Sequence, residues 1–274
     1  MTKRVVVSVR FLATALYAGL ACWFLDSWLP SLQIFGVDAL MAAYPWLAIL
    51  ITCFAVAGVA NAFNIIDGYN GLSAMVGVII LGGVAYVAFQ LADFHIMIAA
   101  LALMGALLGF LVWNYPRGLI FLGDGGAYFV GFWIAELSVL LTARHPEVSA
   151  WAPMLVCGYP LLEVGFSIYR RKKRNLDPGQ PDRLHLHSLV KRRLVRPLLP
   201  GTSNLLRNSA TGAVMWIAAA LPVLIAVQFP TNTAYLAIGF LFCGFAYSAV
   251  YARLTQFKWC VEAATLRGRE TARA

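Results

Sequence analysis

Eight long apolar runs decide what this chain can fold into. Each is about 20 residues long, the length that a helix needs to cross the roughly 30 Å hydrocarbon core of a bilayer. Lipid offers no partner to an unpaired backbone group, so such runs must be helical. The runs are Phe11–Leu29, Trp46–Ile66, Leu72–Leu91, Ile96–Trp113, Ala127–Thr142, Trp151–Tyr169, Ser209–Gln228 and Ala234–Ala252. They predict an all-α, polytopic membrane helix bundle of about eight transmembrane helices, in a single domain over residues 1–274.

The placement of the basic residues predicts how the bundle is oriented. All but Arg144 of the 21 Lys and Arg residues fall on the side that holds both termini and a long polar loop at 170–208. Cytoplasmic loops carry an excess of Lys and Arg, so both termini and this loop are expected in the cytoplasm. The same placement explains the net charge of +9 without a nucleic acid partner. The five cysteines stand singly and are expected to be apolar packing residues.

The second apolar run ends in a polar stretch, NAFNIIDGYNGL, which begins at Asn61. Asn61, Asn64 and Asp67 are three residues apart and would share one broad face of a helix. Gly68 and Gly71 are expected to end the helix and to let the backbone approach a ligand closely. A carboxylate and amides at a membrane boundary can bind a hard cation and hydrogen-bond a nucleotide. The alternative is a capped loop whose amides join neighbouring helices.

A second polar stretch, FLGDGGAYFVGF, begins at Phe121 on the same side of the membrane. Asp124 lies between glycines just before an apolar run. It could be the N-cap of the helix, a position that favours aspartate. It could also be a metal ligand, with Gly125 and Gly126 exposing backbone N–H groups to a phosphate at a helix N-terminus.

The third stretch is DRLHLHS, which begins at Asp182 and follows the basic cluster Arg170–Arg174. The basic cluster itself suits an orientation anchor at the end of a helix. His185 and His187, with Arg183 beside them, suit an oxyanion or a diphosphate, although a chance pair of histidines on a loop is the alternative. All three stretches lie on one face of the membrane. Together they supply the parts of phosphoryl transfer, namely a hard-cation site and groups that hold phosphates, and the setting suggests a lipid substrate.

These three stretches, in this order, resemble the polyprenyl-phosphate N-acetylhexosamine-1-phosphate transferase family. The family pattern N-x-x-N-x-x-D-G-x-[DN]-G-L is met from Asn61 to Leu72, and F-x-G-D-x-G-[SA] from Phe121 to Ala127. The third pattern, H-x-H-H after an Asp-Arg pair, is met except that Ser188 replaces the last histidine. This departure argues against a relative that recognises the pentapeptide of peptidoglycan precursors.

The resemblance implies an enzyme of the bacterial inner membrane with its active site on the cytoplasmic face. It would transfer a sugar 1-phosphate from a UDP-N-acetylhexosamine to undecaprenyl phosphate, releasing UMP, as the first membrane step of O-antigen-like polysaccharide synthesis. Mg²⁺, or Mn²⁺ in its place, is the implied cofactor, and a homodimer is a further expectation. The implied metal ligands are Asn64 and Asp124, the implied catalytic residues are Asp67, Asp124, His185 and His187, and the implied substrate contacts are Asn61, Asn70, Gly71, Gly125 and Arg183.

One family feature is missing from the sequence. Relatives carry an acidic D-D-x-x-D motif before a span with a basic start, and VSVRFLATALYAGL resembles that span from Val7 on, with no acidic pair before it. We therefore expect a chain that lacks the N-terminal spans, through a late start assignment or a true truncation, and that has lost most of its activity if truncated. The alternative function is a catalytically impaired homologue that binds a substrate or a partner. A transporter is a third reading, favoured only by Glu136 in mid-span.

Overall fold

The computed structural model of the chain describes residues 6–175 and 184–256, and the described residues form helices and turns without a strand. The elements are α1 (Val7–Leu25), α2 (Val37–Ala43), α3 (Pro45–Ile66), α4 (Leu72–Gln90), α5 (Phe94–Asn114), α6 (Gly123–Arg144), α7 (Trp151–Val156), α8 (Gly158–Lys173), α9 (Leu186–Val190), the π-helix η1 (Lys191–Val195), α10 (Arg196–Leu198), α11 (Asn204–Gln228) and α12 (Thr233–Thr255). The all-α prediction is confirmed.

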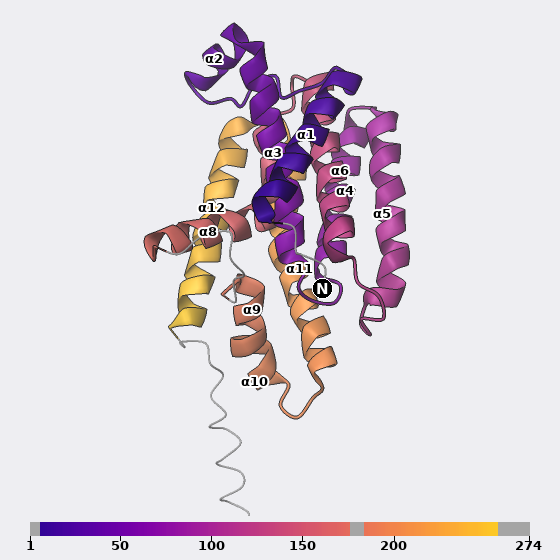
Figure 1. Cartoon of the computed structure of the whole chain (residues 1–274), viewed down its shortest axis with the longest axis vertical. Coiled ribbons are helices and arrows are strands. Elements are labelled where there is room, and N and C mark those ends of the chain that lie inside the picture. The colour runs from indigo at the N-terminus through magenta and orange to yellow at the C-terminus, as the bar shows by residue number, and fades with distance from the viewer. Residues whose placement is uncertain (1–5, 176–183, 257–274) are drawn as a thin grey trace, which may run out of the picture.

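Among the described residues, seven helices are long and apolar enough to cross a membrane, namely α1, α3, α4, α5, α6, α11 and α12. The chain is thus a multi-pass membrane protein. Helix α3 packs on α1 and α6, while α4 packs on α5 and α11. These helices run along the long axis of the molecule, α8 lies across it, α2 lies at one end, and α9 and α10 lie at the other (Figure 1). The cytoplasmic placement of the termini stays a prediction.

The sixth apolar run, Trp151–Tyr169, does not form one spanning helix, and that part of the prediction is wrong. Helix α7 ends at Val156, and α8 begins at Gly158. Pro160 lies in the first turn of α8, where its missing N–H is not needed, whereas in a continuous helix it would leave the carbonyl of Val156 unpaired. The break also brings the backbone close to α11, since a Cβ on Gly158 would lie 3.0 Å from Cβ of Pro222.

The other seven runs each correspond to a long helix, with a shift in the first. The predicted run Phe11–Leu29 is helical from Val7 and ends four residues earlier than expected, at Leu25. Asp26 adopts a left-handed conformation with φ of 46° and closes the helix. Aspartate tolerates this conformation better than most residues. The apolar side chains that follow are therefore not part of the helix.

A buried carboxylate fastens two helices at the end of the bundle that holds α2. Asp93 caps α5 by accepting a hydrogen bond from the Ile96 N–H at 3.2 Å. Its second oxygen lies 3.1 Å from Nε of Arg144 and 3.0 Å from Nε2 of His145, at the end of α6. Burial works to raise the pKa of Asp93, but these hydrogen bonds and the Arg144 charge outweigh it and keep the pKa below its ordinary value. This cluster joins the turn before α5 to the end of α6.

Candidate active site

The first polar stretch forms the end of α3 and the loop that leads into α4, as the glycine spacing predicted. Gly71 has φ of 70°, a left-handed conformation that suits glycine, and α4 starts directly after it. The Gly71 N–H donates to Oδ1 of Asn114 at 2.6 Å, and its carbonyl accepts from Nε1 of Trp216 at 3.0 Å. Helices α5 and α11 therefore hold the backbone of this loop in place. We call this end of the bundle, with the end of α3 and the starts of α4 and α6, the motif end.

Asn70 is turned into the protein rather than toward the carboxylates. Its side chain is buried, and its amide nitrogen donates to the Pro116 carbonyl at 3.1 Å and to Oγ of Ser209 at 3.3 Å. The backbone carbonyl oxygen of Asn70 lies against α11, because a Cβ on Gly212 would come within 2.4 Å of it. Asn70 thus joins the loop to two other segments, and its contact with a substrate stays a prediction.

Asp124 lies in the first turn of α6 with its side chain 71% exposed. The N-cap position belongs to Leu122, which makes no side-chain cap, so the capping alternative for Asp124 is wrong. One carboxylate oxygen accepts from Nδ2 of Asn64 at 2.8 Å, and the other lies 2.6 Å from Nη1 of Arg10. The structure therefore joins the first and second polar stretches directly. Since the amide nitrogen of Asn64 faces the carboxylate, Asn64 can ligate a metal only after a half-turn of its amide.

Asp67 is the second carboxylate at this place. Burial, followed by the charge of neighbouring Asp124, raises the pKa of Asp67 to about 6, although the Gly123 N–H acts in the opposite direction. Two carboxylates that influence each other across the α3–α6 contact would both be stabilised by a cation. Mg²⁺ is usually held by one or two carboxylates together with substrate phosphates and waters. The residues present therefore fit this ion, even though no group of three His, Cys, Asp or Glu converges within residues 6–175 and 184–256.

Asn61 and Gly125 differ in their surroundings. Oδ1 of Asn61 accepts a hydrogen bond from the Tyr128 hydroxyl at 2.9 Å, one turn along α6 from Asp124. A Cβ on Gly125 would meet nothing within 4 Å, so the backbone there faces open space, as a phosphate contact requires. The guanidinium of Arg10 lies 5.9 Å from the centre of the Tyr128 ring. Arg10 was not among the predicted site residues.

The third polar stretch is held by a buried glutamate of α8. Oε1 of Glu163 lies 3.0 Å from Nδ1 of His185 and accepts from the Leu186 N–H at 2.9 Å. Its other oxygen lies 3.9 Å from Nδ1 of His187. The two imidazoles are stacked with their centres 5.2 Å apart. Such contacts fix which nitrogen of His185 carries the proton and which nitrogen faces outward.

His187 is buried and stands against the first polar stretch. A Cβ on Gly68 would lie 3.4 Å from Nε2 of His187, and the Tyr69 ring meets its edge with the centres 5.4 Å apart. Burial lowers the pKa of His187 to about 4, since the Glu163 charge only partly offsets it. His187 is therefore neutral at pH 7 and offers hydrogen bonds rather than a positive charge to a ligand.

The structure thus brings all three polar stretches to the motif end. Asp67, Asp124 and Asn64 form one group, and His185 and His187 form another, which touches the first stretch through Gly68 and Tyr69. Arg183 lies outside the described residues. Glu136 is buried within α6, twelve residues after Asp124 in the sequence and thus about 18 Å along the helix axis at 1.5 Å per residue, so it belongs to neither group.

Comparison with known proteins identifies the family. The sequence model of glycosyl transferase family 4 matches residues 2–142, a little over half of the chain, with the first two polar stretches inside the match. The chain belongs to glycosyl transferase family 4. The third stretch follows the matched region, so its inclusion in the site rests on the contacts of Glu163, His187 and Gly68.

Relatives of this glycosyl transferase family 4 member are named as transferases. The chain is 34% identical over 143 residues to a "Probable undecaprenyl-phosphate N-acetylglucosaminyl 1-phosphate transferase" of Bacillus subtilis, covering 52% of this chain and 40% of the relative. It is 27% identical over 162 residues to the undecaprenyl-phosphate alpha-N-acetylglucosaminyl 1-phosphate transferase of Yersinia pestis, covering 54% and 44%. A phospho-N-acetylmuramoyl-pentapeptide-transferase of Lactiplantibacillus plantarum is 39% identical over 92 residues, covering 34% and 28%. The matches thus span less than half the length of these relatives.

Proposed function

We propose that this chain transfers an N-acetylhexosamine 1-phosphate from a UDP-sugar to undecaprenyl phosphate and releases UMP. In this reaction a phosphate oxygen of the lipid attacks the β-phosphorus of the UDP-sugar. The bond from that phosphorus to the bridging oxygen breaks, UMP leaves, and the sugar remains on a lipid diphosphate. The observation that carries the proposal is the meeting of Asp67, Asp124 and the His185–His187 pair at one end of a membrane bundle. The family match and the names of its relatives support it.

The residues have distinct tasks in this reaction. Asp124, with Asp67 and a turned Asn64, would hold Mg²⁺, which when bound neutralises charge that develops on the phosphates. Arg10 forms an ion pair with Asp124, and its guanidinium can instead pair with a phosphate oxygen when the diphosphate of the UDP-sugar binds. His185, oriented by Glu163, is placed to hydrogen-bond a phosphate. We assign the motif end to the cytoplasmic face of a bacterial inner membrane, because the basic residues gather on that side in the sequence and UDP-sugars are soluble substrates.

The direct test is UMP release by the full chain in detergent with UDP-GlcNAc, undecaprenyl phosphate and Mg²⁺. We expect UMP only when both substrates are present, and none after addition of EDTA. Other UDP-N-acetylhexosamines in place of UDP-GlcNAc would then define the sugar, and the lipid product would show whether it suits an O-antigen-like pathway. Replacing Mg²⁺ with Mn²⁺ in the assay tests whether Mn²⁺ also supports UMP release.

A second function is favoured by the Arg10 contact. The guanidinium lies 2.6 Å from the carboxylate of Asp124, where it competes with a metal ion for that carboxylate, and a site without its metal ion could bind a UDP-sugar without turning it over. A chain that binds UDP-GlcNAc but releases no UMP under these conditions would support this substrate-binding role and contradict the transferase proposal.

Glu163→Gln tests whether the buried carboxylate positions His185. Glutamine keeps an oxygen for the Leu186 N–H but removes the negative charge beside the imidazole. Partners that orient metal-bound histidines contribute about tenfold to a hundredfold. By analogy we expect kcat for UMP release to fall by about that factor while KM for UDP-GlcNAc changes little.

Glu147→Gln is the matched control for this substitution. Glu147 is an exposed carboxylate that also faces a histidine, with Oε1 3.4 Å from Nδ1 of His145, but at the opposite end of α6. The Glu147→Gln substitution should leave kcat for UMP release unchanged. Equal losses of kcat in the two variants, or a loss confined to KM, would contradict a positioning role for Glu163.

A further inference from the structure

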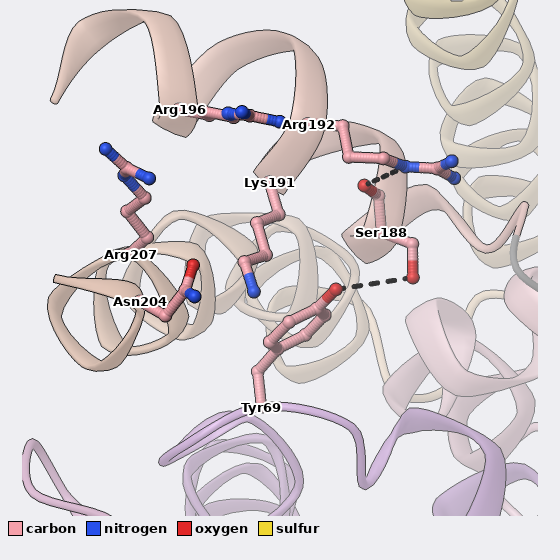
Figure 2. A pocket seen from close by; sticks show the side chains of 7 residues that line it. All are labelled: Tyr69, Ser188, Lys191, Arg192, Arg196, Asn204 and Arg207. Atoms are coloured by element: carbon pink, nitrogen blue, oxygen red, sulfur yellow. Dashed lines mark hydrogen bonds between the residues drawn. The ribbon is translucent and has the colours of Figure 1, made fainter. Parts of the chain in front are cut away.

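A basic pocket lies beside the candidate active site, and Tyr69 of the first polar stretch forms part of its wall. It has a volume of about 570 Å³, within the range of small-molecule sites. Its lining residues are Tyr69, Ser188, Lys191, Arg192, Arg196, Asn204 and Arg207 (Figure 2). They come from the loop after α3, from α9 and η1, from α10 and from the start of α11, and none of the assigned catalytic carboxylates is among them.

The charge of the lining is of one sign. Four of the seven lining residues are Lys or Arg, and none is Asp or Glu. Burial, together with the charge of Arg207, lowers the pKa of Lys191. The lowered pKa reflects the repulsion between neighbouring cations and their partial removal from water. A cleft lined by one sign of charge concentrates ligands of the opposite sign. The pocket is therefore built for an anion that carries more than one negative charge.

Several of the cations are held in position by the fold. Nε and Nη2 of Arg207 donate to the Leu199 carbonyl at 3.2 and 3.1 Å, and Nε of Arg192 donates to the Ser188 carbonyl at 3.2 Å. The amine of Lys191 lies 5.3 Å from the centre of the Tyr69 ring. Figure 2 shows this amine between Tyr69 and Asn204, with Arg196 and Arg207 across the space from it. Charged groups fixed in this way lose little freedom when a ligand binds.

This arrangement differs from that of the basic residues which serve as orientation anchors. Lys172, Lys173 and Arg174 at the end of α8 are also cationic, but they are exposed and do not line this pocket. A membrane anchor requires only charge near the surface. It does not require a pocket, an aromatic wall, or guanidinium groups that donate to backbone carbonyls.

We propose that this pocket binds a diphosphate group, separately from the carboxylates at Asp67 and Asp124. Guanidinium and ammonium groups form short, charge-assisted hydrogen bonds with phosphate oxygens, and a diphosphate supplies enough charge for several of them. The diphosphate can belong to a soluble nucleotide or to a lipid, and the test below distinguishes these sources. The proposal does not depend on the transferase reaction.

The test measures binding of inorganic pyrophosphate to the full chain in detergent, by calorimetry with EDTA present so that no metal-bridged site contributes. Arg196→Gln/Arg207→Gln should weaken binding by about 100-fold, from about tenfold for each charged hydrogen-bonding group removed. Lys173→Gln/Arg174→Gln removes the same charge outside the pocket and should change the affinity by less than about twofold. Asp124→Asn should bind pyrophosphate no more weakly than the unaltered chain.

Further measurements control for misfolding of the variant and distinguish a nucleotide diphosphate from a lipid diphosphate. Arg196→Gln alone changes an exposed residue and should still lose about tenfold, with an unchanged thermal unfolding midpoint. UDP and farnesyl diphosphate then replace pyrophosphate, and whichever binds more tightly to the unaltered chain, and loses more in the Arg196/Arg207 variant, identifies the source. Equal affinities in the pocket and control variants, or absence of pyrophosphate, UDP and farnesyl diphosphate binding in the unaltered chain, would overturn the proposal. If the unaltered chain binds pyrophosphate but releases no UMP, the result would count against the transferase function alone.

Discussion

Asp124→Asn is expected to lower kcat/KM for UMP release by a factor of about 10²–10³, the loss found when a group that stabilises developing charge is removed from an active site. The substitution keeps the shape of the side chain and its contact with Asn64 but removes the negative charge that would hold a cation. Because the carboxylate is 71% exposed and its ion pair with Arg10 lies at the surface, its removal should cost less than about 1 kcal/mol of folding stability. Activity and stability therefore separate at this position.

Asp26→Asn provides the matched control. Asp26 is also exposed, but it closes α1 at the opposite end of that helix from Arg10, in a left-handed conformation that asparagine also tolerates. Both variants should unfold within a degree or two of the unaltered chain, and only Asp124→Asn should lose UMP release and the dependence on added Mg²⁺. Activity that persists in Asp124→Asn would show that the reaction centre lies elsewhere.

The long helices could be predicted from sequence because lipid permits few alternatives. Once an apolar run is long enough to cross a membrane, only a helix satisfies its backbone, so runs such as Trp46–Ile66 could be placed almost to the residue. The break between α7 and α8 was missed because hydropathy does not register hydrogen bonding. The run stays apolar across Gly158 and Pro160, and only the geometry of a proline in mid-helix argues for two helices.

The candidate site was predictable in part for a similar reason. Asn64, Asp67 and Asp124 stood out because polar groups at the edge of an apolar run are costly unless they have a task. Arg10 and Glu163 did not stand out as site residues, since a basic residue before a span reads as an anchor and a single carboxylate has no visible partner. Their roles arise from contacts that a pattern along the chain does not show. Arg10 and Asp124 are separated by 114 positions in the sequence, and Glu163 and His185 by 22 positions.

Asn70 has a structural role that the pattern along the chain did not show. Its place in the first polar stretch favoured a ligand contact, which stays a prediction, and in the structure its amide holds the loop against Pro116 and Ser209. A buried amide must find partners within the protein. When neighbouring segments supply them, a residue that resembles a ligand contact also holds the residues beside it in place.

The largest expected loss of stability comes from Gly131→Ala, where α6 crosses α3. A Cβ on Gly131 would lie 2.6 Å from Cα of Ala60 and 3.0 Å from both the Val59 carbonyl oxygen and Cβ of Phe63. Two of these three atoms belong to backbone, so the helices themselves must move apart. Overpacking of this kind costs about 3 kcal/mol, to be measured as the free energy of unfolding in an SDS titration from mixed micelles.

Gly109→Ala separates this clash from the general effect of adding a methyl group to a membrane helix. Gly109 lies on α5, and a Cβ there would meet nothing within 4 Å. Alanine should be neutral at this position or stabilise the helix by up to about 1 kcal/mol. If the two variants unfold alike, close approach of α3 and α6 does not stabilise the bundle.

The same crossing links packing to the candidate site. Ala60 precedes Asn64 by one helical turn, and Gly131 follows Asp124 by about two turns, so a wider separation of α3 and α6 would lengthen the 2.8 Å contact between the two polar side chains. Helices in lipid gain little from burying apolar surface against each other and depend on close contact between small residues. Gly131→Ala should therefore reduce UMP release even in the fraction that remains folded, whereas Gly109→Ala should not, because only the first substitution changes the distance between the elements that carry Asn64 and Asp124.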